Sequence, residues 1–181
     1  MKNLFFLLFF LGIGIKAQEI SFKKDSEIVL DVTIKFDEIV YYKTNKSFNA
    51  YKLKYKKNHS TKKKLIYDIV KGSTPKSISD NLFVKDLEKL NFHKEKLEAA
   101  QYQKIVDIYT RGSAHYDTSC VKTFRDILVF KNKNKIVGIS KICFDCGWET
   151  TFFNEHHYYN LIDITYFEEL ENLLNSKPNS N

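Results

Sequence analysis

Two apolar stretches separated by a short polar one decide the fold of this chain. Residues 122–131 read KTFRDILVFK, residues 136–144 read IVGISKICF, and the polar run KNKNK occupies residues 131–135. Both apolar stretches are rich in the β-branched and aromatic residues that strands favour, and the polar run is typical of a tight connection. The sequence therefore predicts an antiparallel hairpin that turns about Lys133.

The position of the turn also predicts a register for this hairpin. With the turn at Lys133, residues whose numbers sum to 266 face each other, so Cys120 lies opposite Cys146 at the open end. The same register sets Arg125 opposite Lys141, a mildly unfavourable pair of like charges. A shift of one residue in either direction still keeps the cysteines together, so their proximity is a firmer expectation than their pairing.

The rest of the chain divides into patterns of period two and patterns of helical spacing. Alternation and short apolar runs predict strands at residues 28–36, 39–42, 51–55, 65–70 and 148–153, with residues 57–63 as a hairpin loop. Residues 72–79 are expected to be a connection. Helices are predicted at residues 82–90 and 97–109, the second ended by Gly112, and a last helix follows a Thr165–Glu168 capping box. This order predicts an α+β class: a mostly antiparallel sheet with two central helices and a C-terminal helix.

Length and composition bound the domain organisation. A chain of 181 residues has room for one domain and an export signal. Lys2, the apolar run at residues 4–15 and the small residue Ala17 form the pattern of a secretory signal peptide over residues 1–17. We therefore expect a single α+β domain at 18–175, a polar tail at 176–181, and a periplasmic or extracellular location. No later segment approaches the ~20 apolar residues of a membrane span.

The charge pattern narrows the possible partners. Lys and Arg outnumber Asp and Glu by 29 to 22, and seven lysines fall between residues 52 and 64. Only two arginines, Arg111 and Arg125, are present, whereas nucleic-acid-binding surfaces usually combine arginine with exposed aromatic residues. Nucleic acid is therefore disfavoured, and the expected partner is another protein or an anionic component of the cell envelope.

The chemistry of the chain centres on three cysteines, Cys120, Cys143 and Cys146, the last two in a C-x-x-C motif. In an oxidising compartment the simplest interpretation is a structural disulfide from Cys120 to one of the other two. A thioredoxin-like redox site is disfavoured because Cys143 ends a strand instead of beginning a helix. Haem attachment would need a histidine where Gly147 stands.

Zinc binding is the remaining alternative for the cysteines. The three sulfurs would need a fourth ligand, and the weak candidates are His115, His156 and His157. Adjacent histidines such as His156 and His157 do not share a strand face, and this stretch is better interpreted as a partly exposed loop. One C-x-x-C motif without a second pair is a weak zinc signal. We therefore expect no cofactor, with zinc as the exception to test.

The hairpin also carries a family resemblance. Its FRDILVF strand, the KIVG that follows the turn, and the KICFDC at residues 141–146 resemble an uncharacterised family of small exported Gram-negative bacterial proteins. Members share a cysteine before an Arg-Asp strand and an "ICFEC"-like second strand, where Asp145 stands here for the usual Glu. The resemblance covers residues 120–147 and implies that the cysteines and Arg125-Asp126 form one unit, but it implies no catalytic role.

Arg125 and Asp126 face opposite sides of the predicted sheet, so each needs its own partner or solvent. With His115 they are candidates for a pocket near the sulfurs, but two polar positions on a half-exposed sheet are the favoured explanation of the pair. A His115–Cys120 nucleophile pair lacks an orienting third group.

The sequence predicts an exported, non-enzymatic binding or inhibitory module with a disulfide-linked hairpin. The alternative is a thiol- or metal-dependent enzyme that uses Cys120, Cys143 and Cys146. The sequence shows no catalytic triad, phosphate-binding loop or carboxylate pair that would support an enzyme independently.

Overall fold

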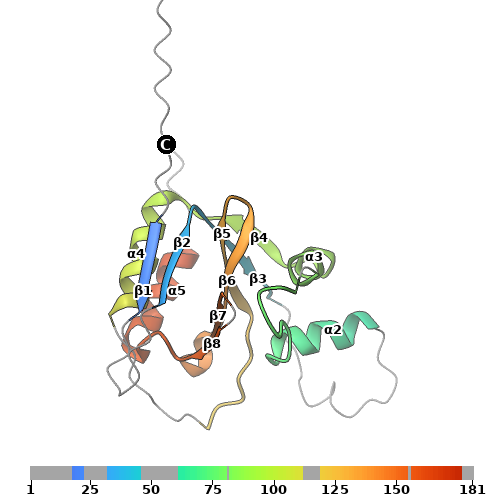
Figure 1. The fold of residues 1–181 in the computed structure, drawn as a ribbon. Coiled ribbons are helices and arrows are strands. Elements are labelled where there is room, and N and C mark those ends of the chain that lie inside the picture. The colour runs from blue at the N-terminus through green and yellow to red at the C-terminus, as the bar shows by residue number, and fades with distance from the viewer. Residues whose placement is uncertain are drawn as a thin grey trace, which may run out of the picture.

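A six-stranded antiparallel sheet organises the chain and confirms the predicted α+β class (Figure 1). The computed structural model describes residues 18–22, 32–45, 61–80, 82–111, 119–154 and 156–176. The strand order is β4-β3-β5-β6-β7-β8. The strands are β3 (Glu38–Lys43), β4 (His93–Lys96), β5 (Asp126–Asn132), β6 (Lys135–Cys143), β7 (Trp148–Phe153) and β8 (His156–Tyr159).

Helices pack on both faces of this sheet, so the molecule has three layers (Figure 1). One face carries α4 (Ala99–Thr110) and α5 (Phe167–Asn175), and the other carries α2 (Thr61–Val70) and α3 (Phe83–Lys89). A two-stranded ribbon of β1 (Gln18–Phe22) and β2 (Val32–Phe36) lies beside α4. Short 3₁₀ turns η1 (Phe144–Cys146) and η2 (Ile164–Tyr166) complete the described elements.

The alternation of the central strands divides the core in two. Along β5, Leu128 and Phe130 face the helices α4 and α5, whereas Ile127 and Val129 face α2 and α3. All four side chains are fully buried. A strand that is apolar on both faces is expected when both faces of a sheet are covered, which explains why FRDILVF has little polar alternation.

The hairpin that the sequence predicts is present, with a corrected register. Lys133 and Asn134 form its two-residue turn, with φ values of +48° and +65°, and β5 pairs antiparallel with β6. Lys141 faces Ile127 and not Arg125, so the predicted register was wrong by two residues along most of the ladder. A bulge between Phe130 and Lys131 changes the pairing near the turn, which a symmetric count from Lys133 cannot anticipate.

The predicted strand at residues 65–70 was wrong, because these residues belong to α2. The helix buries Ile66, Ile69 and Val70 against the sheet. These positions follow the i, i+3, i+4 spacing of one helix face, and a short apolar run cannot by itself distinguish a helix from a buried strand. Of the predicted hairpin loop at residues 57–63, residues 61–63 belong to α2 instead, and residues 57–60 lie outside the described residues.

Two edge strands lie where the sequence predicted none. Residues 93–96 form β4, a charged strand, and residues 156–159 form β8 in place of the expected loop. Both are four residues long and border the sheet, so they pair on one side only and need little apolar patterning. The last helix is present, but the side chain of Asp163 caps the turn before it, in place of the predicted Thr165–Glu168 box.

The remaining predictions that fall on described residues agree with the structure. The predicted strand at 39–42 lies within β3, and the one at 148–153 is β7. The two predicted central helices are α3 and α4. Of the predicted strand at 28–36, residues 32–36 form β2. Residues 1–17, 28–31, 51–55 and Gly112 lie outside the described residues, and with them the predicted signal peptide. Across the described ranges, no helix has the length and apolar character to cross a membrane.

Candidate functional site

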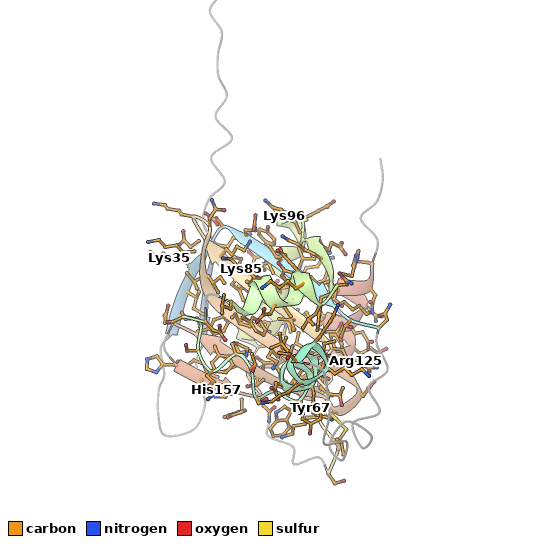
Figure 2. All side chains as sticks on the ribbon, turned by 90° about the vertical axis from the view of Figure 1, so that its right-hand side faces the viewer. Lys35, Tyr67, Lys85, Lys96, Arg125 and His157 are labelled. Carbon is orange, nitrogen blue, oxygen red and sulfur yellow. A yellow bond between two sulfur atoms is a disulfide. The ribbon has the colours of Figure 1, made fainter. Side chains whose placement is uncertain are left out.

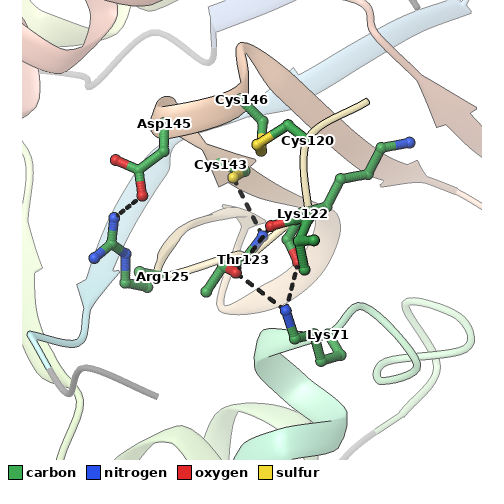
Figure 3. A network of polar contacts seen from close by, with 9 residues as sticks. Lys71, Cys120, Lys122, Thr123, Arg125, Cys143, Asp145 and Cys146 are labelled. Atoms are coloured by element: carbon green, nitrogen blue, oxygen red, sulfur yellow. Dashed lines mark hydrogen bonds and ion pairs between the residues drawn. A yellow bond between two sulfur atoms is a disulfide. The ribbon is translucent and has the colours of Figure 1, made fainter. Parts of the chain in front are cut away.

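A disulfide bond joins Cys120, just upstream of β5, to Cys146, the last residue of η1. The two Cα atoms lie 5.7 Å apart, within the usual range for a disulfide. The bond agrees with the structural disulfide that the sequence favoured. It links the surface segment at residues 119–125, termed the anchored segment, to the far end of the β5–β6 hairpin (Figure 3).

The third cysteine is a free, buried thiol. Cys143 ends β6, is only 1% exposed, and packs with Phe124, Cys146 and Trp148. The backbone N–H of Thr123 donates a hydrogen bond to its Sγ, with a donor–acceptor distance of 3.2 Å. The C-x-x-C motif therefore holds one bonded and one unbonded sulfur in the same cluster.

A lysine from the helical layer reaches the anchored segment (Figure 3). Lys71 follows α2 directly, and its Nζ donates to the carbonyl of Lys122 at 3.1 Å and to Oγ1 of Thr123 at 3.2 Å. Burial lowers the pKa of Lys71, and its interaction with Cys143 opposes that shift. The buried, mainly apolar surroundings of the free sulfur thus include two polar neighbours, the N–H of Thr123 and the ammonium of Lys71.

Phe124 is the apolar anchor of the segment. Its side chain is 4% exposed, and its backbone N–H donates to the carbonyl of Val70 at 2.8 Å. A Cβ added at Gly72 would lie 2.9 Å from the Phe124 ring, and Gly72 has a φ of +91°. The turn after α2 therefore requires glycine both for its backbone conformation and for the space that the ring occupies.

A buried lysine also contacts the region around Phe124. Lys141 of β6 is fully buried, and its Nζ donates to the carbonyls of Ile69 and Thr74. The Nζ also lies 5.2 Å from the centroid of the Phe124 ring. Burial lowers the pKa of Lys141 to about 7. This lysine thus ties the sheet to the end of α2 through backbone oxygens.

The adjacent residues Arg125 and Asp126 have separate partners, as their opposite faces require. Arg125 forms a surface ion pair with Asp145 of η1, next to the disulfide. Asp126 is buried on the other side of the sheet, where the Tyr41 hydroxyl donates to its carboxylate at 2.5 Å. Burial raises the pKa of Asp126, and the hydrogen bond from Tyr41 opposes that effect. Of the two, only Arg125 therefore lies beside the disulfide, through its pair with Asp145.

Between these anchors, one apolar side chain points into solvent. Val121 is 72% exposed, more than any other large hydrophobic residue among those described. Its neighbour Lys122 places its Nζ 2.9 Å from the centroid of the Trp148 ring. Residues on both sides of Val121 are thus held by a covalent bond, an aromatic contact and hydrogen bonds, while its own side chain is presented outward.

Two of the histidines that the sequence singled out, His156 and His157, lie outside the sulfur cluster. His156 and His157 lie on β8, and His157 stacks on Phe152 with ring centroids 4.0 Å apart. His115 lies outside the described residues. Figure 2 shows His157 and Arg125 toward the end of the molecule away from Lys35 and Lys96. Among the residues that the structure describes, no three His, Cys, Asp or Glu side chains are grouped to hold a metal ion.

Sequence reasoning missed a second buried polar network, on the face that packs against α4. The Tyr109 hydroxyl donates to Ser140 Oγ at 2.6 Å, and Ser140 donates to Glu149 at 3.1 Å. The other oxygen of Glu149 accepts the N–H of Leu161 at 2.9 Å. Burial raises the pKa of Glu149 to about 8. The signal was available, because Glu149 shares its strand face with Phe153, where an apolar residue is expected.

Comparison with known proteins adds no further assignment. No protein-family model, no curated protein and no solved structure matches the chain.

Proposed function

We propose that the chain is an exported, non-enzymatic binding protein that recognises a partner protein through its anchored segment. The observation that carries the proposal is the contrast within residues 119–125: the backbone is held by the Cys120–Cys146 bond and its neighbours, yet Val121 is 72% exposed. Ordering a loop before binding reduces the entropy that association costs. A held segment with an outward apolar side chain is suited to that role.

The surroundings of Val121 indicate the chemistry of the partner. Lys122 and Arg125 belong to the segment and Lys71 contacts it, and of these Arg125 is already paired with Asp145. Interfaces commonly combine an apolar anchor with a polar rim. The complementary surface is a small apolar pocket bordered by acidic side chains.

The disulfide supports the export part of the proposal. Disulfides persist in oxidising compartments and are rare in the reducing cytosol. The bond between Cys120 and Cys146 therefore fits a chain that leaves the cytosol. Sequencing of the N-terminus of the exported protein is expected to begin near Gln18, and an intact Met1 on that protein would contradict export by a cleaved signal.

Photo-crosslinking from within the full-length protein tests the binding role. A photoreactive amino acid at position 121 is expected to yield one discrete protein adduct in the cell envelope. The same group at Lys104, an exposed position on α4, is the matched control and should yield none. The double variant Cys120→Ser/Cys146→Ser should lose the adduct at position 121. Equal crosslinking from both positions, or an adduct that survives loss of the disulfide, would contradict the proposal.

A further inference from the structure

The Cys120–Cys146 disulfide has an unbonded sulfur in its own cluster, that of Cys143. Cys143 packs in the same cluster as Cys146, and Figure 3 shows its sulfur next to the Cys120–Cys146 bond. Cys143 is 1% exposed and Cys146 is 5% exposed, whereas Cys120 is exposed. A buried thiol has little access to reagents in solution, but the neighbours of Cys143 in its cluster include a half of the disulfide, Cys146.

Two polar groups lie near the buried sulfur of Cys143. The thiolate is the species that attacks a disulfide, and hydrogen-bond donors and nearby positive charges stabilise it. The N–H of Thr123 donates to Sγ at 3.2 Å, and the ammonium of Lys71 is held on the same segment through Thr123 Oγ1. Both features act on the sulfur that the disulfide leaves free.

We propose that Cys143, Cys146 and Cys120 form an internal thiol–disulfide exchange site. The Cys143 thiolate attacks Sγ of Cys146, a Cys143–Cys146 bond forms, and the Cys146–Cys120 bond breaks. The electron pair of the broken bond leaves with Cys120, which takes up a proton from solvent in place of the one that Cys143 released. One disulfide is exchanged for another, so no oxidant or reductant is consumed.

Exposure sets the direction of the attack. Attack on Cys146 expels the sulfur of Cys120, which water can solvate, whereas attack on Cys120 would expel the buried sulfur of Cys146 without that hydration. The exchange places a free thiol on the surface and releases the covalent tether of the anchored segment. The exchange would loosen the segment that presents Val121. The exchange itself requires no binding partner, so its test is independent of the proposed binding role.

Labelling under native conditions tests the exchange on the full-length oxidised protein. A bulky maleimide is added, the reaction is quenched with acid, and disulfide-linked peptides are mapped. Exchange predicts the label on Cys120 and a Cys143–Cys146 disulfide in the same molecules. A label on Cys143 with the original bond intact would show local opening instead, and it would overturn the proposal, as would complete absence of label.

Variants separate the attacking thiol from its surroundings. Cys143→Ser removes the attacking sulfur and should abolish the labelling of Cys120. Lys71→Gln keeps a hydrogen-bond donor without the charge and should slow the labelling several-fold, whereas Lys71→Arg should restore it. Equal labelling rates in the wild type and in Cys143→Ser would contradict the exchange.

A second measurement does not depend on the native bond. In Cys120→Ser, the two remaining cysteines are expected to form an intramolecular disulfide on mild oxidation, with the loss of two hydrogen atoms in intact mass. Circular dichroism of this variant checks that it is folded. A folded Cys120→Ser protein that keeps both thiols under these conditions would show that Cys143 cannot reach Cys146, and the proposal would fail.

Discussion

The two ends of the β5–β6 hairpin are closed in different ways. At the turn end, Lys133 and Asn134 adopt positive φ values, and Asp37 accepts the N–H of Lys133 at 2.9 Å. At the cysteine end, the disulfide and the Phe124 ring hold the strands to the surrounding layers. Both ends have partners from distant parts of the sequence. The turn end is shaped by the backbone conformation of two adjacent residues and held by exposed polar contacts, while the cysteine end adds a covalent bond and a buried apolar cluster.

This difference indicates that the contacts which stabilise the hairpin, and its reactive groups, are concentrated at the cysteine end. Val70, Lys71 and Thr74 all reach the cysteine end, although they lie about fifty or more residues before it in the chain. At the cysteine end, side chains take part in apolar packing, in the disulfide bond and in contacts between charged and polar groups. We therefore expect substitutions at the cysteine end to have large effects and substitutions in the turn to have small ones.

The largest effect is expected from Phe124→Ala. The ring is buried against Gly72, and its removal leaves a cavity that the held backbone cannot close. The free energy of unfolding should fall by about 3–5 kcal/mol, measured by urea denaturation. Leu82→Ala, at a side chain that is 58% exposed, is the control and should change it by no more than about 0.5 kcal/mol. A loss below about 1 kcal/mol at Phe124 would mean that the segment is not anchored by this ring.

Loss of the disulfide should come next. The bond spans 26 residues, so the double variant Cys120→Ser/Cys146→Ser should lose about 3 kcal/mol, chiefly through the greater freedom of the unfolded chain. Reductant should destabilise the wild type by a similar amount and leave the double variant unchanged. Cys143→Ala is the matched control, because it should keep the sensitivity to reductant. If reductant had no effect on the wild type, the bond would not contribute to stability.

The pH dependence of stability should show two opposite limbs, one for each buried ionisable group near the cysteine end. Burial lowers the pKa of Lys141 from 10.5 to about 7, so between these values the unfolded state binds more protons and stability rises with pH. Burial raises the pKa of Glu149 from 4.5 to about 8, so between these values the native state binds more protons and stability falls as pH rises. Each slope can reach about 1.4 kcal/mol per pH unit.

Substitution assigns each limb to its residue. Lys141→Met should flatten the rise of stability above pH ~7, and Glu149→Gln should flatten the fall between pH ~4.5 and ~8. Chemical denaturation at a series of pH values measures both in the same protein. A rise above neutral pH that persists in Lys141→Met would assign that limb to another group.

The smallest effects are expected in the turn. Asn134 has a φ of +65°, where glycine is unstrained, so Asn134→Gly should change the free energy of unfolding by no more than about 0.5 kcal/mol. Asn134→Val places a β-branched side chain in the left-handed region and should cost about 1 kcal/mol. Thermal unfolding of the two variants checks both values. A loss from Asn134→Val as large as that from Phe124→Ala would remove the contrast between the two ends.

The sequence predicts the turn end of the hairpin better than the cysteine end. The KNKNK turn and the strands beside it depend on residues close in sequence, and they are found within a residue or two of their predicted places. The register was wrong by two residues for two reasons: the turn is centred between Lys133 and Asn134 and not on Lys133, and the bulge after Phe130 adds a second shift. The sequence left the partner of Cys120 open between Cys143 and Cys146, and the tertiary structure decided for Cys146.

What the sequence by itself determined is the α+β class, the hairpin, helix α4 and the neighbourhood of the cysteines, because apolar spacing and turn residues act over short distances. Tertiary structure alone decided that residues 65–70 are helical, that β4 and β8 border the sheet, and that Lys141 and Glu149 are buried. Each of these outcomes depends on which surface packs against a segment, and that surface comes from residues far away in the chain. A six-residue apolar run satisfies either a helix or a strand until its partner is present, and a polar side chain can be buried only where distant oxygens or donors meet it.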